Sequence, residues 1–313
     1  MSLAPDAESF KRLVTGTSRG PAATVARLGL AVLAAPYGLA VAARNAAYDA
    51  GFLPVAAAGV PVIAIGNLTL GGTGKTPLVA WAAGLLARHG RRPAIVSRGY
   101  GAARGERSDE AAELAVVLPG VPHVADRDRV AGAARAAAAG ADVVLLDDGF
   151  QHRRLARDLD VVAVDATDPF GCGRLFPRGL LREPLAGLAR AGAVVLTRAA
   201  TVDGRRRAEI RDRLAAACRG RLPTVWTEAD HRPAALRTPA GGTRPLADLH
   251  AARVFAFAGI GNPSAFRDTL AALGAVVVGF RPLPDHHRYS AADLDLLGDA
   301  ARSARAERAA SPS

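Results

Sequence analysis

A glycine-rich stretch at residues 63–77 constrains this chain more than any other feature of its sequence. An apolar run at residues 60–65 precedes the glycines, and a helical pattern follows them over residues 77–88. A strand, a glycine-rich turn and a helix in this order form the context of a phosphate-binding loop. The glycines let backbone N–H groups converge on a phosphate, and the helix N-terminus adds its positive dipole end. The stretch therefore predicts a nucleotide-binding protein.

The loop follows the pattern G-x-x-x-x-G-K-[ST], with Thr69 in place of the first glycine. Gly71 and Gly72 are expected to supply the missing flexibility. Lys75 is expected to reach the β- and γ-phosphates, and the Thr76 hydroxyl to bind Mg²⁺. The residues predicted to hold the nucleotide in this loop are Gly71, Gly72, Thr73, Gly74, Lys75 and Thr76.

The use of lysine supports this interpretation. The chain has 40 Lys and Arg residues, but only Lys11 and Lys75 are lysines. An arginine-rich chain has therefore placed one of its two lysines where a phosphate site needs a compact ammonium group. No lysine follows Lys75, so the Asn-Lys-x-Asp element with which GTPases recognise guanine is absent. The sequence therefore disfavours a GTPase.

Charge and composition limit the partners. The formal net charge is +11, which indicates an anionic partner such as a phosphorylated substrate or a phospholipid surface. Aromatic residues make up only 5% of the chain and no nucleic-acid-binding module is recognisable, so a nucleic acid partner is not expected. The two cysteines, Cys172 and Cys218, lack the spacing of a metal or redox site.

Apolar runs alternate with helical patterns downstream of the loop. The runs expected to form strands are residues 92–98, 114–117, 141–146, 159–164 and 193–196. This alternation predicts an α/β fold, with the mostly parallel, helix-flanked sheet of P-loop NTPases. A length of 313 residues suggests two domains. The boundaries expected from the sequence are 1–55 for an N-terminal tail and hydrophobic helix, 56–203 for the nucleotide-binding core and 204–313 for a smaller α/β domain.

The N-terminal region holds a run without charge at residues 28–43, which Pro36 and Gly38 interrupt. Its 16 residues are fewer than the roughly 20 that span a bilayer. Three placements stay open: a buried helix, a short membrane anchor, or a helix lying in the membrane interface. The flanking arginines favour membrane contact.

Asp147 and Asp148 end the apolar run at residues 141–146, where a second Mg²⁺-binding motif belongs in this class. An Asp pair that only caps the following turn is the alternative. Gln151 and His152 follow directly and are candidates for contacts with nucleotide or substrate. A base is needed to accept a hydroxyl proton, and both Asp109 and the cluster at residues 284–287 qualify.

Several strings together resemble the tetraacyldisaccharide 4′-kinase family. They are the loop at residues 66–77, Arg98-Gly99-Tyr100-Gly101 and residues 147–152, followed by residues 177–184, 195–198, 257–263 and 285–290. The resemblance implies ATP-dependent phosphorylation of the 4′-hydroxyl of an acylated glucosamine disaccharide 1-phosphate in lipid A biosynthesis. It also implies an enzyme at the cytoplasmic face of the bacterial inner membrane, with its N-terminal helix against that anionic lipid surface.

The resemblance also assigns roles to individual residues. Asp109 is implied as the catalytic base and His286 as its partner, and Asp147 or Asp148 as the Mg²⁺ ligand beside Thr76. Arg98, His152 and Arg182 are weaker candidates for contacts with the substrate. Members of the family continue beyond the last helix, so a shortened second domain is expected. The alternative is a P-loop ATPase or nucleotide-dependent switch without lipid kinase activity.

Overall fold

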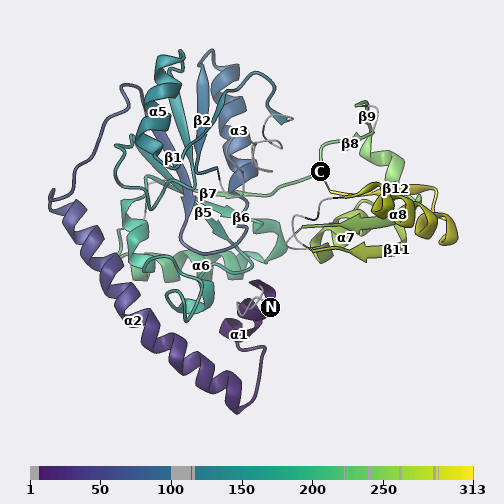
Figure 1. Cartoon of the computed structure of the whole chain (residues 1–313), viewed down its shortest axis with the longest axis horizontal. Helices are drawn as coiled ribbons and strands as arrows, with labels where there is room; N and C mark the ends of the chain where they lie inside the picture. The colour runs from purple at the N-terminus through teal and green to yellow at the C-terminus, as the bar shows by residue number, and fades with distance from the viewer. Residues whose placement is uncertain are drawn as a thin grey trace. The chain divides into compact units, whose positions relative to one another are not determined.

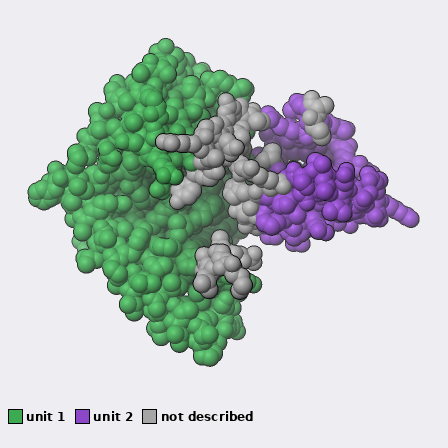
Figure 2. Space-filling view, viewed as in Figure 1, with its two compact units in different colours: residues 1–231 green, residues 232–313 purple. Residues whose placement is uncertain are grey.

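The computed structural model describes residues 7–99, 114, 117–221, 223, 225–238, 241–260, 263–284, 287 and 289–312. The chain forms two compact units, residues 1–231 and 232–313, which are coloured separately in Figure 2. Each unit has its own sheet and its own apolar clusters.

The first unit is built on a seven-stranded parallel sheet with the order β3-β2-β4-β1-β5-β6-β7. Its strands are β1 (Val62–Asn67), β2 (Pro93–Ser97), β3 (His123–Ala125), β4 (Val143–Asp147), β5 (Leu159–Asp165), β6 (Ala193–Thr197) and β7 (Val225–Ala229). All five residues of β2, β4 and β6 are buried, as expected when helices cover both faces of a parallel sheet. The prediction of a mostly parallel, helix-flanked α/β sheet is confirmed.

Helices lie on both faces of this sheet, and α3 and α5 are visible on either side of β2 in Figure 1. The helices of the first unit are α1 (Ala7–Thr15), α2 (Pro21–Asp49), α3 (Lys75–Arg88), α5 (Arg129–Ala138) and α6 (Gly204–Ala217), with short 3₁₀ turns η1 (Gly171–Gly173), η2 (Leu185–Arg190) and η3 (Ala199–Thr201). Alternate side chains of β1 point to opposite faces of the sheet. Ala64 packs in the cluster with α5, and Ile65 packs in the cluster with α3. The two faces of β1 therefore each pack against a helical layer.

The domain boundary expected at 203/204 is wrong. Helix α6 buries Ile210 and Leu214 in the core of the first unit, and β7 pairs with β6 in parallel register. The first unit therefore continues to His231. The turn before α6 reads as a linker because of its polar composition, but Asp203 acts there as a helix cap, accepting from the Arg206 N–H at 2.7 Å.

The strand expected at residues 114–117 is also wrong. Leu114 and Val117, expected in a strand, are helical, and Leu114 packs in the cluster under α3. The edge strand is β3, which pairs with β2. A four-residue apolar run does not distinguish a strand from a helical turn by its pattern alone.

The second unit contains a three-stranded parallel sheet with the order β11-β10-β12. Its elements are β8 (Leu236–Arg237), β9 (Thr243–Arg244), η4 (Leu246–Leu249), β10 (Arg253–Ala258), α7 (Pro263–Ala272), β11 (Val276–Pro282), α8 (Ala291–Ser303) and β12 (Arg308–Ala310). Helices α7 and α8 pack in separate clusters against β10, where Val254 and Phe255 point to opposite faces. The last strand, β12, pairs with β10 in parallel.

Helix α2 is continuous from Pro21 to Asp49, through Pro36, and runs along the outside of the first unit (Figure 1). Gly38 lies close to the core, since a Cβ there would come within 2.8 Å of Leu175 Cδ1. By length and composition the helix could cross a membrane. Only 6% of its most apolar 18-residue segment is buried. The alternative of a buried helix is therefore wrong.

Candidate functional site

The glycine-rich loop joins β1 to α3 as the sequence predicts. Gly74 has φ +78° and caps α3, and Gly71 has φ +104°, so both occupy backbone conformations that favour glycine. Gly66 sits under the loop against Phe150, and a Cβ there would meet the Phe150 backbone nitrogen at 2.7 Å. The glycines thus bring the loop backbone close to the sheet edge and free the N-terminus of α3 for an anion.

Neighbouring strands hold the far side of this loop. The Thr197 hydroxyl, at the end of β6, donates to the Thr73 carbonyl at 2.8 Å. Arg198 donates to the Gly72 carbonyl at 3.1 Å and forms an ion pair with Asp165 at the end of β5. No role for these three supporting residues is predicted from the sequence. Thr197 and Asp165 are the last residues of their strands and Arg198 is the next residue after β6, so all three are polar residues that end an apolar run.

Lys75 lies at the first turn of α3 and its ammonium group is held from two sides. It donates to Asn67 Oδ1 at 3.1 Å and lies 3.6 Å from Asp148 Oδ1. Asn67 in turn donates to the Thr69 carbonyl at 2.7 Å. The ammonium is therefore fixed over the start of the loop by the last residue of β1.

The Asp pair reaches the same place because β4 is the neighbour of β1, with Asp147 in register with Ile65. Asp147 is buried, and Asp148 turns into a left-handed conformation with φ +52°. Arg182 binds Asp148 Oδ2 at 2.6 Å. Burial raises the pKa of the Asp148 carboxyl, but Lys75 and Arg182 outweigh it, so its pKa lies below the usual value and the carboxylate stays ionised.

Arg129 is a site residue that no sequence pattern predicts. It is the first residue of α5, its side chain is buried, and it donates to the Asp147 carbonyl at 3.3 Å. Burial lowers the pKa of its guanidinium, and the charges of Asp148 and Asp147 act in the opposite direction. A charged residue at the start of an Ala-rich helix gives no signal of burial, because such positions are usually exposed.

The residues present fit a phosphate ligand with a divalent cation. The Thr73 hydroxyl and the Arg182 Nε are buried with no hydrogen-bond partner in the described part of the chain. Among the described residues, no group of three or more His, Cys, Asp or Glu side chains could hold a metal ion. Mg²⁺ in phosphate sites takes one or two carboxylates plus phosphate oxygens and water, so Asp147, Asp148 and Thr76 supply a donor set of the right chemistry.

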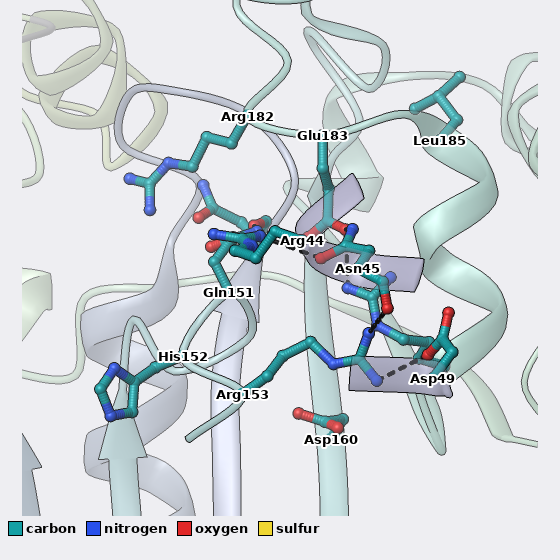
Figure 3. Close-up of polar contacts among 12 residues, drawn as sticks. Arg44, Asn45, Asp49, Gln151, His152, Arg153, Asp160, Arg182, Glu183 and Leu185 are labelled. Carbon is teal, nitrogen blue, oxygen red and sulfur yellow. Dashed lines mark hydrogen bonds and ion pairs between the residues drawn. The ribbon is translucent and has the colours of Figure 1, made fainter. Parts of the chain in front are cut away.

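The amide nitrogen of Gln151, a predicted nucleotide contact, is bound by protein groups. Its amide nitrogen donates to the Asn67 carbonyl at 2.8 Å and to Glu183 Oε1 at 3.0 Å. Both acceptors belong to the protein, so the side chain links the loop to Glu183 (Figure 3). No local sequence pattern predicts this contact, because the partner carboxylate lies 32 residues away.

The other predicted residues are placed as follows. Arg98 follows β2 and is exposed, and Arg182 binds Asp148. In Figure 3 the His152 ring points away from the contacts around Glu183. Asp109 and His286 lie outside the described residues.

His152 allows a pH prediction. Burial, helped by the charge of Arg129, lowers its pKa to about 4. The unfolded chain takes up this proton near pH 6.5, so stability is fully present above about pH 6.5 and falls as the pH drops toward 4. We expect the melting temperature of His152→Gln to fall less steeply over this window than that of the wild type. The exposed His231→Gln variant should follow the wild type, and equal slopes for His152→Gln and the wild type would contradict the burial of a neutral ring.

Known proteins match this architecture over most of the chain. A family model described as Tetraacyldisaccharide-1-P 4′-kinase matches residues 26–308. The Tetraacyldisaccharide 4′-kinase of Anaeromyxobacter sp. (strain Fw109-5) is 48% identical over 306 residues, covering 89% of this chain and 81% of the relative. The chain belongs to the tetraacyldisaccharide-1-P 4′-kinase family.

More distant members agree. The Tetraacyldisaccharide 4′-kinase of Geobacter sulfurreducens is 38% identical, covering 94% of this chain and 85% of that protein. The crystal structure of LpxK from Aquifex aeolicus in complex with ATP is 34% identical, with a TM-score of 0.70 over 85% of this chain and 84% of that one. The family match includes the phosphate loop and both compact units, so the resemblance read from the sequence strings is confirmed.

Proposed function

We propose that the phosphate loop and the carboxylates beside it carry out the 4′-kinase reaction of the family in this chain. As a family member, the chain is an ATP- and Mg²⁺-dependent kinase whose substrate is the lipid A precursor disaccharide 1-phosphate. The convergence of Lys75, Asp148 and Arg182 where β1 and β4 end carries our assignment of roles. A nucleotide-dependent switch without kinase activity is not favoured, because the match to these kinases spans both units.

In this proposal the loop amides of Gly71, Gly72, Thr73 and Gly74 bind the ATP phosphates at the start of α3. Lys75, already held by Asn67 and Asp148, contacts the β- and γ-phosphates. Bound Mg²⁺ would neutralise charge on those phosphates, with Thr76 and the Asp147–Asp148 pair as its protein ligands. The fixed positions of these groups supply orientation and electrostatic stabilisation, which dominate phosphoryl transfer.

Asp109 is proposed as the base and His286 as the residue that orients it. The base accepts the proton of the 4′-hydroxyl as its oxygen forms a bond to the γ-phosphorus. The bond between the γ-phosphorus and the β–γ bridging oxygen breaks, and ADP leaves. The support for both residues is the role that the family resemblance implies for them, since neither lies among the described residues. Arg98 and His152 are proposed as substrate contacts on the same ground.

The enzyme is membrane-associated, as its lipid substrate class requires. We place it at the cytoplasmic face of the inner membrane, where ATP is available. Large apolar side chains of α2 are exposed by 59% to 72%, namely Val25, Leu28, Val32, Leu33 and Leu39. Such a surface suits contact with lipid, and the net charge of +11 favours an anionic leaflet.

The proposed base is tested by phosphate transfer. We expect Asp109→Ala to lower kcat for transfer of labelled γ-phosphate to the acylated disaccharide 1-phosphate by about 100- to 10,000-fold, the usual contribution of general base catalysis. His286→Gln should cause a smaller loss, since it acts through the base. Assays use Mg-ATP and full-length protein in detergent micelles.

Equilibrium binding of ATP serves as the control for this experiment. Both variants should bind ATP as the wild type does, because neither residue is assigned a phosphate contact. Full transfer activity in Asp109→Ala would assign the base elsewhere. Wild-type protein that binds ATP but never labels the lipid acceptor would overturn the kinase reaction itself.

A further inference from the structure

A short segment, Leu180–Glu183, runs alongside the phosphate loop, and we call it the strap. The Leu70 N–H donates to the Leu180 carbonyl at 2.7 Å, and the Arg182 N–H donates to the Leu68 carbonyl at 2.8 Å. Thr69 and Leu181 form an antiparallel bridge between these bonds. The first half of the phosphate loop is therefore paired along its backbone with the strap.

The side chains of the strap reinforce this pairing. Arg182 binds Asp148, which also faces Lys75. Glu183 accepts from Gln151, and the same Gln151 nitrogen donates to the Asn67 carbonyl. Backbone and side chains of the strap thus contact the loop at its first residues and at the carboxylate that holds its lysine.

Two side chains on the inner face of α2 donate hydrogen bonds to the strap. The Tyr37 hydroxyl donates to the Arg182 carbonyl at 2.7 Å, and Asn45 Nδ2 donates to Glu183 Oε2 at 3.1 Å. These positions are two helical turns apart on one face, and Val41, buried, lies between them. Figure 3 shows Asn45 directed at the Glu183 carboxylate, and Asp49, farther along the same helix, paired with Arg153.

The Glu183 carboxylate connects α2 to Gln151, and its position depends on the donors around it. Its side chain is completely buried, with 0% exposure, and it is surrounded by donors from Asn45, Gln151 and Arg190. Asn45 and Arg190 share Oε2, so a Glu183 carboxylate that loses Asn45 is drawn toward Arg190, its remaining charged donor. Movement of Glu183 would be passed to Gln151 and hence to the loop at Asn67.

We propose that α2 positions the phosphate loop for ATP through the strap, with Tyr37 and Asn45 as positioning residues. Helix α2, whose outer face is apolar, is thus connected to the nucleotide site by two hydrogen bonds to the strap and by the pairing of the strap with the loop. This inference rests on ATP binding at the loop, as proposed above. It gives α2 a role in nucleotide affinity that is separate from contact with lipid.

The test is equilibrium binding of ATP to full-length protein in detergent micelles. Each hydrogen bond is worth about 1 kcal/mol net, or roughly fivefold in affinity where its loss reaches the loop. We expect Tyr37→Phe and Asn45→Ala each to weaken ATP binding by up to about fivefold, and the double variant by about tenfold or more. KM for ATP should rise in parallel, with a smaller change in kcat.

Asp49→Asn is the matched control. Asp49 lies on the same helix and pairs with Arg153 at 2.7 Å, but it does not contact the strap. It should bind ATP within about twofold of the wild type, the margin expected for an exposed ion pair. Wild-type ATP affinity in the double variant would overturn the proposal, and so would an equal loss in Asp49→Asn, which would indicate general loosening of α2. A Lys75→Ala variant that binds ATP normally would instead contradict the proposed nucleotide site.

Discussion

Replacing Lys75 with alanine is expected to lower kcat for phosphate transfer by about 1000-fold, the upper range for loss of one preorganised donor to a developing charge. The ammonium is held by Asn67 at 3.1 Å and lies 3.6 Å from Asp148, so its position is set before ATP binds. Its removal takes away both the positive charge and the geometry. The measurement is transfer of labelled γ-phosphate from Mg-ATP to the acylated disaccharide 1-phosphate in micelles.

The chain offers a matched control for this variant, because Lys11 is its only other lysine. Lys11 lies in α1 and its side chain is exposed. Lys11→Ala removes the same charge from the protein and should keep activity within about twofold, since exposed charges contribute little. A comparable loss in both variants would show that net charge, rather than the loop lysine, determines the rate. Unchanged transfer in Lys75→Ala would remove the loop from the reaction.

The sequence predicts the sheet of the first unit well, and the reason is physical. Strands such as β4 and β6 are buried on both faces, so their apolar runs are continuous and carry no helical period. The polar residues that follow them then mark the edge where a ligand binds. Lys75, Asp147 and Asp148 could be predicted in this way, and the structure brings all three to the ends of β1 and β4.

Strands at the edges of the two sheets are harder to predict from the sequence. The strand β7 is only partly buried and follows an arginine-rich helix, so little in the sequence assigns it to the first unit. The strand β12 has three residues and is paired on one side only. Short edge strands have little apolar signal, because half of their surroundings is solvent. The domain boundary moved from 203/204 to 231/232 for this reason.

Contacts between distant segments lie beyond any local pattern. Arg129 starts a helix, and its burial against Asp147 depends on how α5 packs beside β4. Gln151 follows the Asp pair closely enough to suggest a nucleotide contact, yet Glu183 and the Asn67 carbonyl take its amide. In each case the residue type was visible in the sequence, but its partner was set by the tertiary fold.

The substitution Asp148→Asn is expected to lower kcat by about 100-fold. Asparagine keeps the size of the side chain and is tolerated at the positive φ of +52° found here. It removes the negative charge that faces Lys75 and binds Arg182, and with it a proposed Mg²⁺ ligand. Because both cations stay in place, ATP binding should be retained or tightened while transfer slows. Transfer rates across a Mg²⁺ titration, alongside equilibrium ATP binding, measure the two effects separately.

Asp148→Ala separates charge from backbone strain in this experiment. Alanine removes the same charge but disfavours positive φ, so it should lower the melting temperature more than asparagine does while slowing transfer equally. If instead only alanine slows transfer, the role of Asp148 is to hold the turn, and the carboxylate is not needed for catalysis.

The lowered pKa of Asp148 adds an expectation about pH. The carboxylate stays ionised until the pH falls below the usual range for an Asp, so the rate loss in Asp148→Asn should be constant from pH 6 to 8.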